Sequence, residues 1–375
     1  MQSEKCAMHQ WLAEPVDTSI RQAIGCLADC EDVCHIAVMP DVHLAENVCV
    51  GLAVATARRI YPDAVGGDIG CGMAAVQLTA SAGALRRQSA AMELLDALRR
   101  MVPTNRRGRE NARPLSEELS PDLLSVPQLR TQADRNGRVQ FGTLGGGNHF
   151  VEFQADEQDR LWIMVHSGSR AMGPAIRQTH LAMAQKTGFL PSLDADSPAG
   201  LAYLNDAAWA ERYAAGSRRA TLDDACATAR KVLGAQVVEG SLIECCHNHV
   251  RREVHSGRKL WAHRKGANRA GENEIGIIPG SMGAPSFHVA GRGEVNSLYS
   301  SSHGAGRRLS RSAARATIAV RDLQRQMGEV WFDARRAHEL REEAPKAYRD
   351  ILKVMRAQSE LVRIVRKLRP VLNYK

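Results

Sequence analysis

Short apolar runs alternate with glycine-rich turns in three separate parts of the chain. Residues 33–79 read VCHIAVMPDVH, VCVGLAVATA and YPDAVGGDIGCGMAAVQL, and similar runs return from residue 139 and over residues 241–303. Apolar runs of this length, bounded by glycine and proline, are typical of β-strands joined by tight loops. The pattern therefore predicts strands whose connecting loops hold many histidine, cysteine and acidic side chains.

Helical periodicity fills the intervals between these parts. Residues 84–102 are amphipathic, residues 171–240 are mostly helical in pattern, and residues 311–368 read as helical with dense charge. Residues 103–138 are rich in arginine, proline, asparagine and serine, which predicts a mobile loop region. We therefore expect an α/β fold: one mixed-sheet domain over residues 1–375, with long helical insertions and a helical C-terminal region.

Composition narrows the class of protein. Hydrophobic residues make up 44% of the 375 positions and charged residues 24%, as in folded globular proteins. No stretch resembles a signal peptide, and no apolar run approaches the roughly 20 residues that cross a bilayer. We expect a cytoplasmic protein with no membrane partner. The net charge of +9 favours a polyanionic partner, nucleic acid above all.

The nine cysteines include no CxxC pair, so neither a disulfide framework nor a zinc ribbon is indicated. Cys26, Cys30 and Cys34 have the spacing of one helical face. Core packing explains that spacing better than a metal cluster does.

A carboxylate and a thiol lie three residues apart in DIGCGM, at Asp68 and Cys71. Three further apolar runs end in a histidine beside small residues: His149, His166 and His247. Each histidine alone is ordinary, but together the five side chains suit a borderline-soft divalent ion such as Mn²⁺ or Zn²⁺. A thiolate can also bridge two ions, and a pair of ions can clamp phosphoryl oxygens.

Other loops offer anion-binding or acid–base groups. Asp41 in PDVH is either part of a simple turn or a group that orients a ligand or acts as a base. GTLGGGNHF and IIPGSMGAPS, with Ser281 and Ser286, present unhindered backbone N–H groups to an anion. SSSHGAGRR is either a tight turn before a helix or a nucleophilic His303 with Arg307 beside it to balance phosphate charge.

Six motifs then occur in a fixed order: DIGCGM, GGGNHF, HSGSR, HRKGA, IIPGSMG and SHGAGR. With them the chain resembles the RtcB family of RNA ligases from about residue 35 onward. The resemblance implies an enzyme that uses GTP and Mn²⁺, with Zn²⁺ or Co²⁺ able to substitute in vitro. It implies RNA substrates whose 3′-phosphate or 2′,3′-cyclic phosphate end is joined to a 5′-hydroxyl end. It does not indicate whether a helper protein is needed.

The resemblance also implies residue roles. Cys71 would bridge two metal ions, with Asp68 and His149 completing one site and His166 and His247 the other. His303 would accept GMP as a covalent phosphoramidate. Family positions around the guanine nucleotide are occupied by Asn148, Glu152, Ser281, Ser286, Gly304, Gly306, Tyr348 and Lys375. Further catalytic positions are matched by Asp41, Arg170 and Lys265.

One loop departs from the family pattern. After PDVH the chain has Ala45, Glu46 and Asn47 where a run of the type x-G-x-G is usual. An acidic Glu46 near an RNA path would repel phosphates, which suggests a specialised paralogue that repairs damaged ribosomal RNA rather than spliced tRNA halves. Two other functions compete with ligation: a metal-dependent phosphodiesterase that only opens 2′,3′-cyclic phosphates, and a non-catalytic RNA-binding protein. The phosphodiesterase would not need His303.

Overall fold

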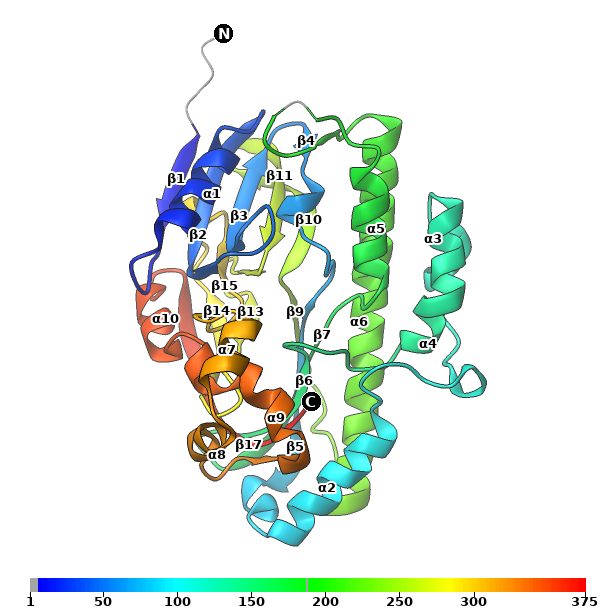
Figure 1. Ribbon diagram of the computed structural model, residues 1–375, viewed down its shortest axis with the longest axis vertical. Helices are drawn as coiled ribbons and strands as arrows, with labels where there is room; N and C mark the ends of the chain where they lie inside the picture. Colours follow the sequence, from blue (N-terminus) through cyan, green and yellow to red (C-terminus); the bar gives the residue numbers. More distant parts are fainter. Residues whose placement is uncertain (1–5, 187) are drawn as a thin grey trace.

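The structure, a computed structural model, describes residues 6–186 and 188–375 (Figure 1). A five-stranded sheet has the order β1-β2-β3-β11-β10, and its strands meet antiparallel except for the parallel pair β1 and β2. The strands of this sheet are β1 (Ala7–Gln10), β2 (Val33–His43), β3 (Val50–Thr56), β11 (Arg258–Lys265) and β10 (Asn248–His255). Its core is the apolar residues of the runs at residues 33–56, as the sequence pattern predicts.

A larger, eight-stranded sheet has the order β13-β14-β17-β6-β7-β5-β9, with β16 pairing to β17 off this path. Its strands are β5 (Gly72–Ser81), β6 (Phe150–Ala155), β7 (Arg160–Ser167), β9 (Ile243–Cys246), β13 (Ile275–Ile278), β14 (Ser286–Gly291), β16 (Trp331–Phe332) and β17 (Val362–Tyr374). Two short pairs complete the strands: β4 (Arg59–Ile60) with β8 (Leu193–Asp194), and β12 (Ala267–Arg269) with β15 (Ser300–Ser302).

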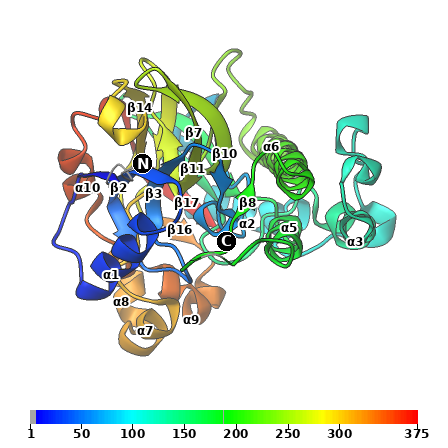
Figure 2. The same ribbon diagram turned by 90° about the horizontal axis from the view of Figure 1, so that it is seen from above.

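The helices lie around these sheets. They are α1 (Thr18–Ala28), α2 (Gln88–Met101), α3 (Pro127–Gln132), α4 (Arg138–Gln140), α5 (Met172–Leu181), α6 (Pro198–Leu233), α7 (Arg311–Thr317), α8 (Val320–Met327), α9 (Ala337–Leu340) and α10 (Ile351–Ala357). In Figure 2, α5 and α6 are seen nearly end-on beside the strands, with α3 outermost. The side chain of Ser197 caps the start of α6, and Gly234 ends this helix in the left-handed conformation that glycine adopts without strain.

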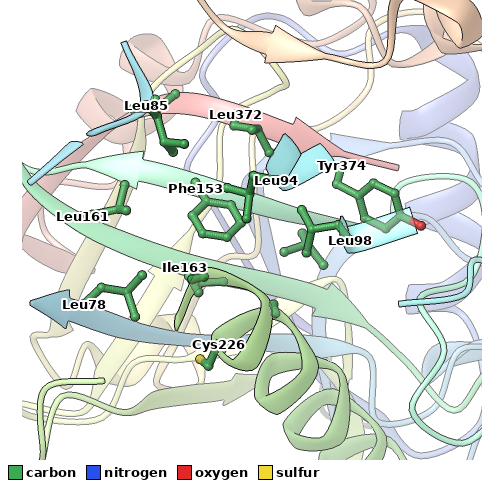
Figure 3. Close-up of a cluster of buried hydrophobic side chains, with 14 of the residues drawn as sticks. Leu78, Leu85, Leu94, Leu98, Phe153, Leu161, Ile163, Cys226, Leu372 and Tyr374 are labelled. Carbon is green, nitrogen blue, oxygen red and sulfur yellow. The ribbon is translucent and has the colours of Figure 1, made fainter. Parts of the chain in front are cut away.

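Strand alternation gives the large sheet two different faces. Phe153, Ile163 and Leu372 point to one face, where Leu94 and Leu98 of α2 cover them in a buried cluster (Figure 3). Neighbouring residues on the same strands point to the opposite face, because side chains alternate along a strand. That second face holds Glu152, His166 and Asn373, so a polar site lies directly behind an apolar core.

The structure confirms the mixed α/β class and corrects three boundaries. Residues 362–368 are not helical but begin β17, where pairing to both β14 and β6 outweighs their dense charge. Cys34 lies on β2 rather than on a helical face, because α1 ends at Ala28. Residues 103–138 are not wholly loop, since they include α3 and several short helical turns.

Candidate functional site

A cavity of about 310 Å³ lies between the two sheets. His43, Val50 and Lys265 line it from the five-stranded sheet, and Phe150 and His166 line it from the eight-stranded sheet. The predicted site residues that line this cavity are Asp68, Cys71, Asn148, Glu152, His166, His247, Lys265, Ser281, Ser286, His303, Gly304, Gly306, Tyr348 and Lys375. The structure thus brings together side chains more than 300 positions apart in the chain.

Five predicted metal-binding residues meet at one end of this cavity, and we call Asp68, Cys71, His149, His166 and His247 the metal-type cluster. Their ligand atoms form two groups, each with all atoms within 4.8 Å of one another. One group is Asp68, Cys71 and His149, and the other is Cys71, His166 and His247. Cys71 belongs to both groups, so its sulfur is placed where a bridging ligand would be needed.

The histidines of the cluster are oriented by backbone carbonyls. Nδ1 of His149 lies 3.1 Å from the carbonyl oxygen of Leu144, and Nδ1 of His166 lies 2.9 Å from that of Asn148. A carbonyl only accepts, so each Nδ1 holds the proton and Nε2 keeps its lone pair. Both Nε2 atoms face the sulfur of Cys71, at 3.6 and 3.2 Å. Nε2 of His149 also lies 3.0 Å from Oδ2 of Asp68, so the donor atoms of the cluster converge on one another around the sulfur.

The charge states also suit a cation. Burial lowers the pKa of His166 and His247 well below the usual value, so both imidazoles are neutral, as metal ligands are. Burial raises the pKa of the Cys71 thiol, so the thiolate needs a cation beside it. A set of one carboxylate, one thiol and three imidazoles fits a borderline-soft divalent ion.

Backbone contacts between loops hold this cluster together. The N–H of His247 donates to the carbonyl of Cys71 at 2.9 Å, and the N–H of Gly70 donates to that of Asn248 at 2.8 Å. The side chain of Asn248 donates to the carbonyl of Asp68 at 3.0 Å. The sequence alone does not identify Asn248 as a site residue, because an asparagine one residue after His247 looks like any other loop asparagine.

His303 lies next to the metal-type cluster, with its ring centroid 4.8 Å from that of His247. Its Nδ1 is 2.7 Å from Oδ2 of Asp41, a fully buried carboxylate, although the angle departs from that of a hydrogen bond. The same oxygen accepts from the N–H groups of His303 and Gly304 at 3.2 and 3.3 Å. Asp41 does not line the cavity but lies behind His303, so its contact leaves Nε2 as the free ring nitrogen.

The other end of the cavity is organised around Glu343, which sequence reasoning missed. Its carboxylate accepts from Nζ of Lys375 at 2.9 Å, Nη1 of Arg307 at 3.0 Å and the hydroxyl of Tyr348 at 2.5 Å. We call these four residues the Glu343 network. The guanidinium of Arg307 also lies over the Tyr348 ring, 4.9 Å from its centroid. Arg307 is thus largely engaged by protein groups.

Glu152 and Asn373 face each other across the pair of strands β6 and β17. Nδ2 of Asn373 donates to Glu152 at 2.8 Å, and Nε2 of Gln154 donates to its other oxygen at 2.7 Å. Burial raises the pKa of Glu152 to about 8, so this side chain is mostly protonated at neutral pH. Oδ1 of Asn373 is buried without a hydrogen-bond partner among the described residues.

The two predicted basic residues lie in different places. Nζ of Lys265 donates to the carbonyls of Val48 and Asp63 at 2.8 and 3.2 Å, which leaves one of its three protons for the cavity. Burial lowers its pKa to about 8. Arg170 does not line the cavity: it donates to Asn105 at 2.8 Å behind the GGG loop, residues 145–147. Its catalytic role, which the family resemblance implies, stays a prediction.

The GGG loop is glycine-rich partly for packing. Gly145 has φ +100°, and a Cβ there would collide with His149 and Arg170. His149 itself lines a second cavity of about 310 Å³ on the far side of this loop, together with Arg336 and Lys375. His149 therefore separates this second cavity from the rest of the metal-type cluster.

The acidic residue of the loop that departs from the family pattern is paired with a cation from helix α5. Glu46 pairs with Arg177 at 2.9 Å, and Asn47 donates to Asp63 at 2.8 Å. Arg177 also pairs with Asp63. Because Glu46 has a cationic partner, it repels phosphates less than its sequence alone suggests.

Comparison with known proteins agrees with this geometry. The family described as "tRNA-splicing ligase RtcB" matches residues 24–127 and 120–375. The RNA-splicing ligase RtcB of Escherichia coli K12 is 38% identical over 98% of this chain and 97% of its own length. RNA-splicing ligase RtcB1 of another Escherichia coli strain is 37% identical over the same shares, and RtcB2 of that strain is 29% identical over 94% and 91%.

No helix in the described part of the chain combines the length and apolar character that a membrane span requires. The matched family extends over most of the sequence, including every residue of the metal-type cluster and the Glu343 network. Together with the two relatives above 30% identity, this match shows that the chain belongs to the RtcB family of RNA ligases.

Proposed function

We propose that this chain is a GTP- and Mn²⁺-dependent ligase that joins RNA 3′-phosphate or 2′,3′-cyclic phosphate ends to 5′-hydroxyl ends. The observation that carries the proposal is the placement of His303. Its Nδ1 is held 2.7 Å from Asp41, and its ring lies 4.8 Å from that of His247 in the metal-type cluster. A nucleophile and a group of metal-type ligands thus share one cavity wall.

The chemistry follows from the free nitrogen. With the proton on Nδ1 toward Asp41, the Nε2 lone pair attacks the α-phosphorus of GTP, and pyrophosphate leaves. An oxygen of the RNA 3′-phosphate then attacks the same phosphorus, which breaks the P–N bond and restores His303. The 5′-hydroxyl finally attacks the activated 3′-phosphorus, losing its proton as GMP leaves. A cyclic phosphate is first hydrolysed to the 3′-monophosphate.

The metal-type cluster would hold two divalent ions, with Cys71 shared between them. When bound, such ions stabilise negative charge that develops on phosphoryl oxygens. Lys265 adds one free N–H donor in the same cavity, and its pKa of about 8 keeps it mostly cationic at neutral pH. Glu152 and Lys375 lie at the end where we place the guanine base. Damaged ribosomal RNA stays the predicted natural substrate, and cleaved tRNA is the alternative.

The test is intact-mass spectrometry after incubation with GTP and Mn²⁺. We expect a GMP adduct on the wild type and none on His303→Ala. His9→Ala is the control, because His9 lies on β1, outside the cavity lining. An adduct that persists on His303→Ala would reject the assigned nucleophile. A wild type that binds metal but forms no adduct would favour the cyclic phosphodiesterase instead.

A further inference from the structure

Helix α6 packs directly against the loop that holds two members of the metal-type cluster. Gly70 lies between Asp68 and Cys71 with φ +76°, and a Cβ there would be 2.8 Å from both Cβ of Ala214 and Cα of Glu211. Real Cβ atoms do not approach backbone that closely. The helix and this loop therefore have little freedom to move relative to each other.

Arg218 of α6 connects this loop to a second one. The side chain is buried, and its Nη1 donates to the carbonyl of Gly70 at 2.6 Å and to that of Ser167 at 3.1 Å. Ser167 follows His166 directly in the chain. One guanidinium thus joins the Asp68–Cys71 loop to the end of β7, where the pairing of Gly72 with Ser167 already holds Cys71 near His166.

The neighbouring residue connects a third loop. The N–H of Gly142 donates to Oγ of Ser217 at 3.0 Å, and Gly142 begins the segment that leads to His149. The fourth segment reaches the cluster through the backbone bond from His247 to Cys71. Consecutive residues of a single helix therefore fix three of the four segments that form the cluster.

The burial of Arg218 calls for an explanation, because a guanidinium inside a protein is costly without compensation. Across residues 6–186 and 188–375, it forms no ion pair with a carboxylate, its attraction to Glu211 acts at longer range, and its Nε has no hydrogen-bond partner. Its two recorded acceptors are both main-chain carbonyls of cluster loops. A side chain needed only for packing would not require a charged head at this place.

We propose that Arg218 is a positioning residue that holds the Asp68–Gly70 turn against the end of β7, so that Asp68 and the shared Cys71 stay in place for both metal sites. This inference rests on the proposed metal-dependent function of the cluster. Loss of the guanidinium frees the carbonyl of Gly70 from the end of β7, so the Asp68–Cys71 loop shifts although Gly72 stays paired with Ser167. The sulfur then serves one ion better than two. Residues that orient metal ligands typically change metal affinity by about 10- to 100-fold.

The experiment titrates Co²⁺ into metal-free protein and follows the thiolate-to-Co²⁺ absorbance band together with the number of ions bound. The variants are Arg218→Met, which keeps the side-chain length, and Arg218→Lys, which keeps the charge. Arg219→Met is the matched control, because its side chain is 59% exposed and pairs with Glu244 on the surface. Circular dichroism of the metal-free proteins monitors folding.

We expect two Co²⁺ ions on the wild type and on Arg219→Met. Arg218→Met should bind at least one ion about tenfold more weakly, with an altered band, and Arg218→Lys should fall between them. Two ions at wild-type affinity with an unchanged band in folded Arg218→Met would overturn the proposal. If Arg218→Met does not fold, Arg218→Lys decides by the same two criteria. Absence of Co²⁺ binding by the wild type would instead reject the proposed metal function.

Discussion

Around Cys71, the Nε2 atoms of His149 and His166 face the sulfur, and the close polar contacts, such as that of His149 with Asp68, join the ligands themselves. Around Glu343, by contrast, each charged group already has a partner from another part of the fold. A cation that binds in the metal-type cluster replaces contacts among its own ligands, such as the one between His149 and Asp68. The Glu343 network must exchange an existing contact when a ligand arrives. One end of the cavity thus uses preorganised metal-type donors, and the other uses a stable ion network that can be reorganised.

The strongest way to break this contrast is to remove the shared sulfur. Cys71→Ala takes a ligand from both groups, so Co²⁺ binding should be lost. Ligation should then fall at least about a thousandfold, because each ion supplies several kcal/mol of charge stabilisation. Cys245→Ala is the control, since that sulfur lies outside the cluster, 3.9 Å from the carbonyl of Ile277. Two bound ions in Cys71→Ala would show that the sulfur does not bridge.

A smaller effect is expected at the other end. Glu343→Gln leaves Lys375 and Arg307 buried without their carboxylate, which should lower the free energy of unfolding by about 2–3 kcal/mol in urea titrations. Co²⁺ binding should be unchanged, because the metal-type cluster does not use this network. Glu339→Gln is the control, because its side chain is 68% exposed and pairs with Arg336. If Glu343→Gln lost Co²⁺ binding as well as stability, the two ends of the cavity would be coupled.

The smallest effect concerns pH. Burial raises the pKa of Glu152 from 4.5 to about 8, so the folded protein binds this proton more tightly than the unfolded chain does. Its contribution to stability is therefore lost as pH rises from about 4.5 to 8. Glu152→Gln lacks this titrating group. The Tm of the variant minus the Tm of the wild type should therefore increase as pH rises through this range. A wild-type Tm that falls no faster with pH than that of the variant would contradict the assigned pKa.

The residues of the metal-type cluster could be predicted because each lies in a short motif at a strand end. The contact between Asp41 and His303 could not, since 262 positions separate them and only the folded sheets bring them together. Glu343 lies in a charged segment, REEAP, that resembles a solvated surface helix. It is buried because Arg307, Tyr348 and Lys375 converge on it from distant parts of the chain, which no local pattern reveals.

The prediction that residues 362–368 are helical was wrong for a related reason. Alternation of arginine and apolar residues in VRIVRKLRP suits either a helix face or a strand. Pairing of β17 on both sides, to β14 and β6, decides the outcome. The local sequence pattern was enough to identify the site motifs, whereas the arrangement of the sheet depends on strand pairing between distant segments.

The central position of β17 has a consequence for synthesis on the ribosome. Its partner β6 ends at Ala155, so about two hundred residues must be made before the strand that pairs with it emerges. Until then β6 and β14 present open hydrogen-bonding edges, which are prone to pair with other chains. The large sheet closes late and through distant contacts, so we expect slow folding and a need for protection from aggregation in the nascent chain.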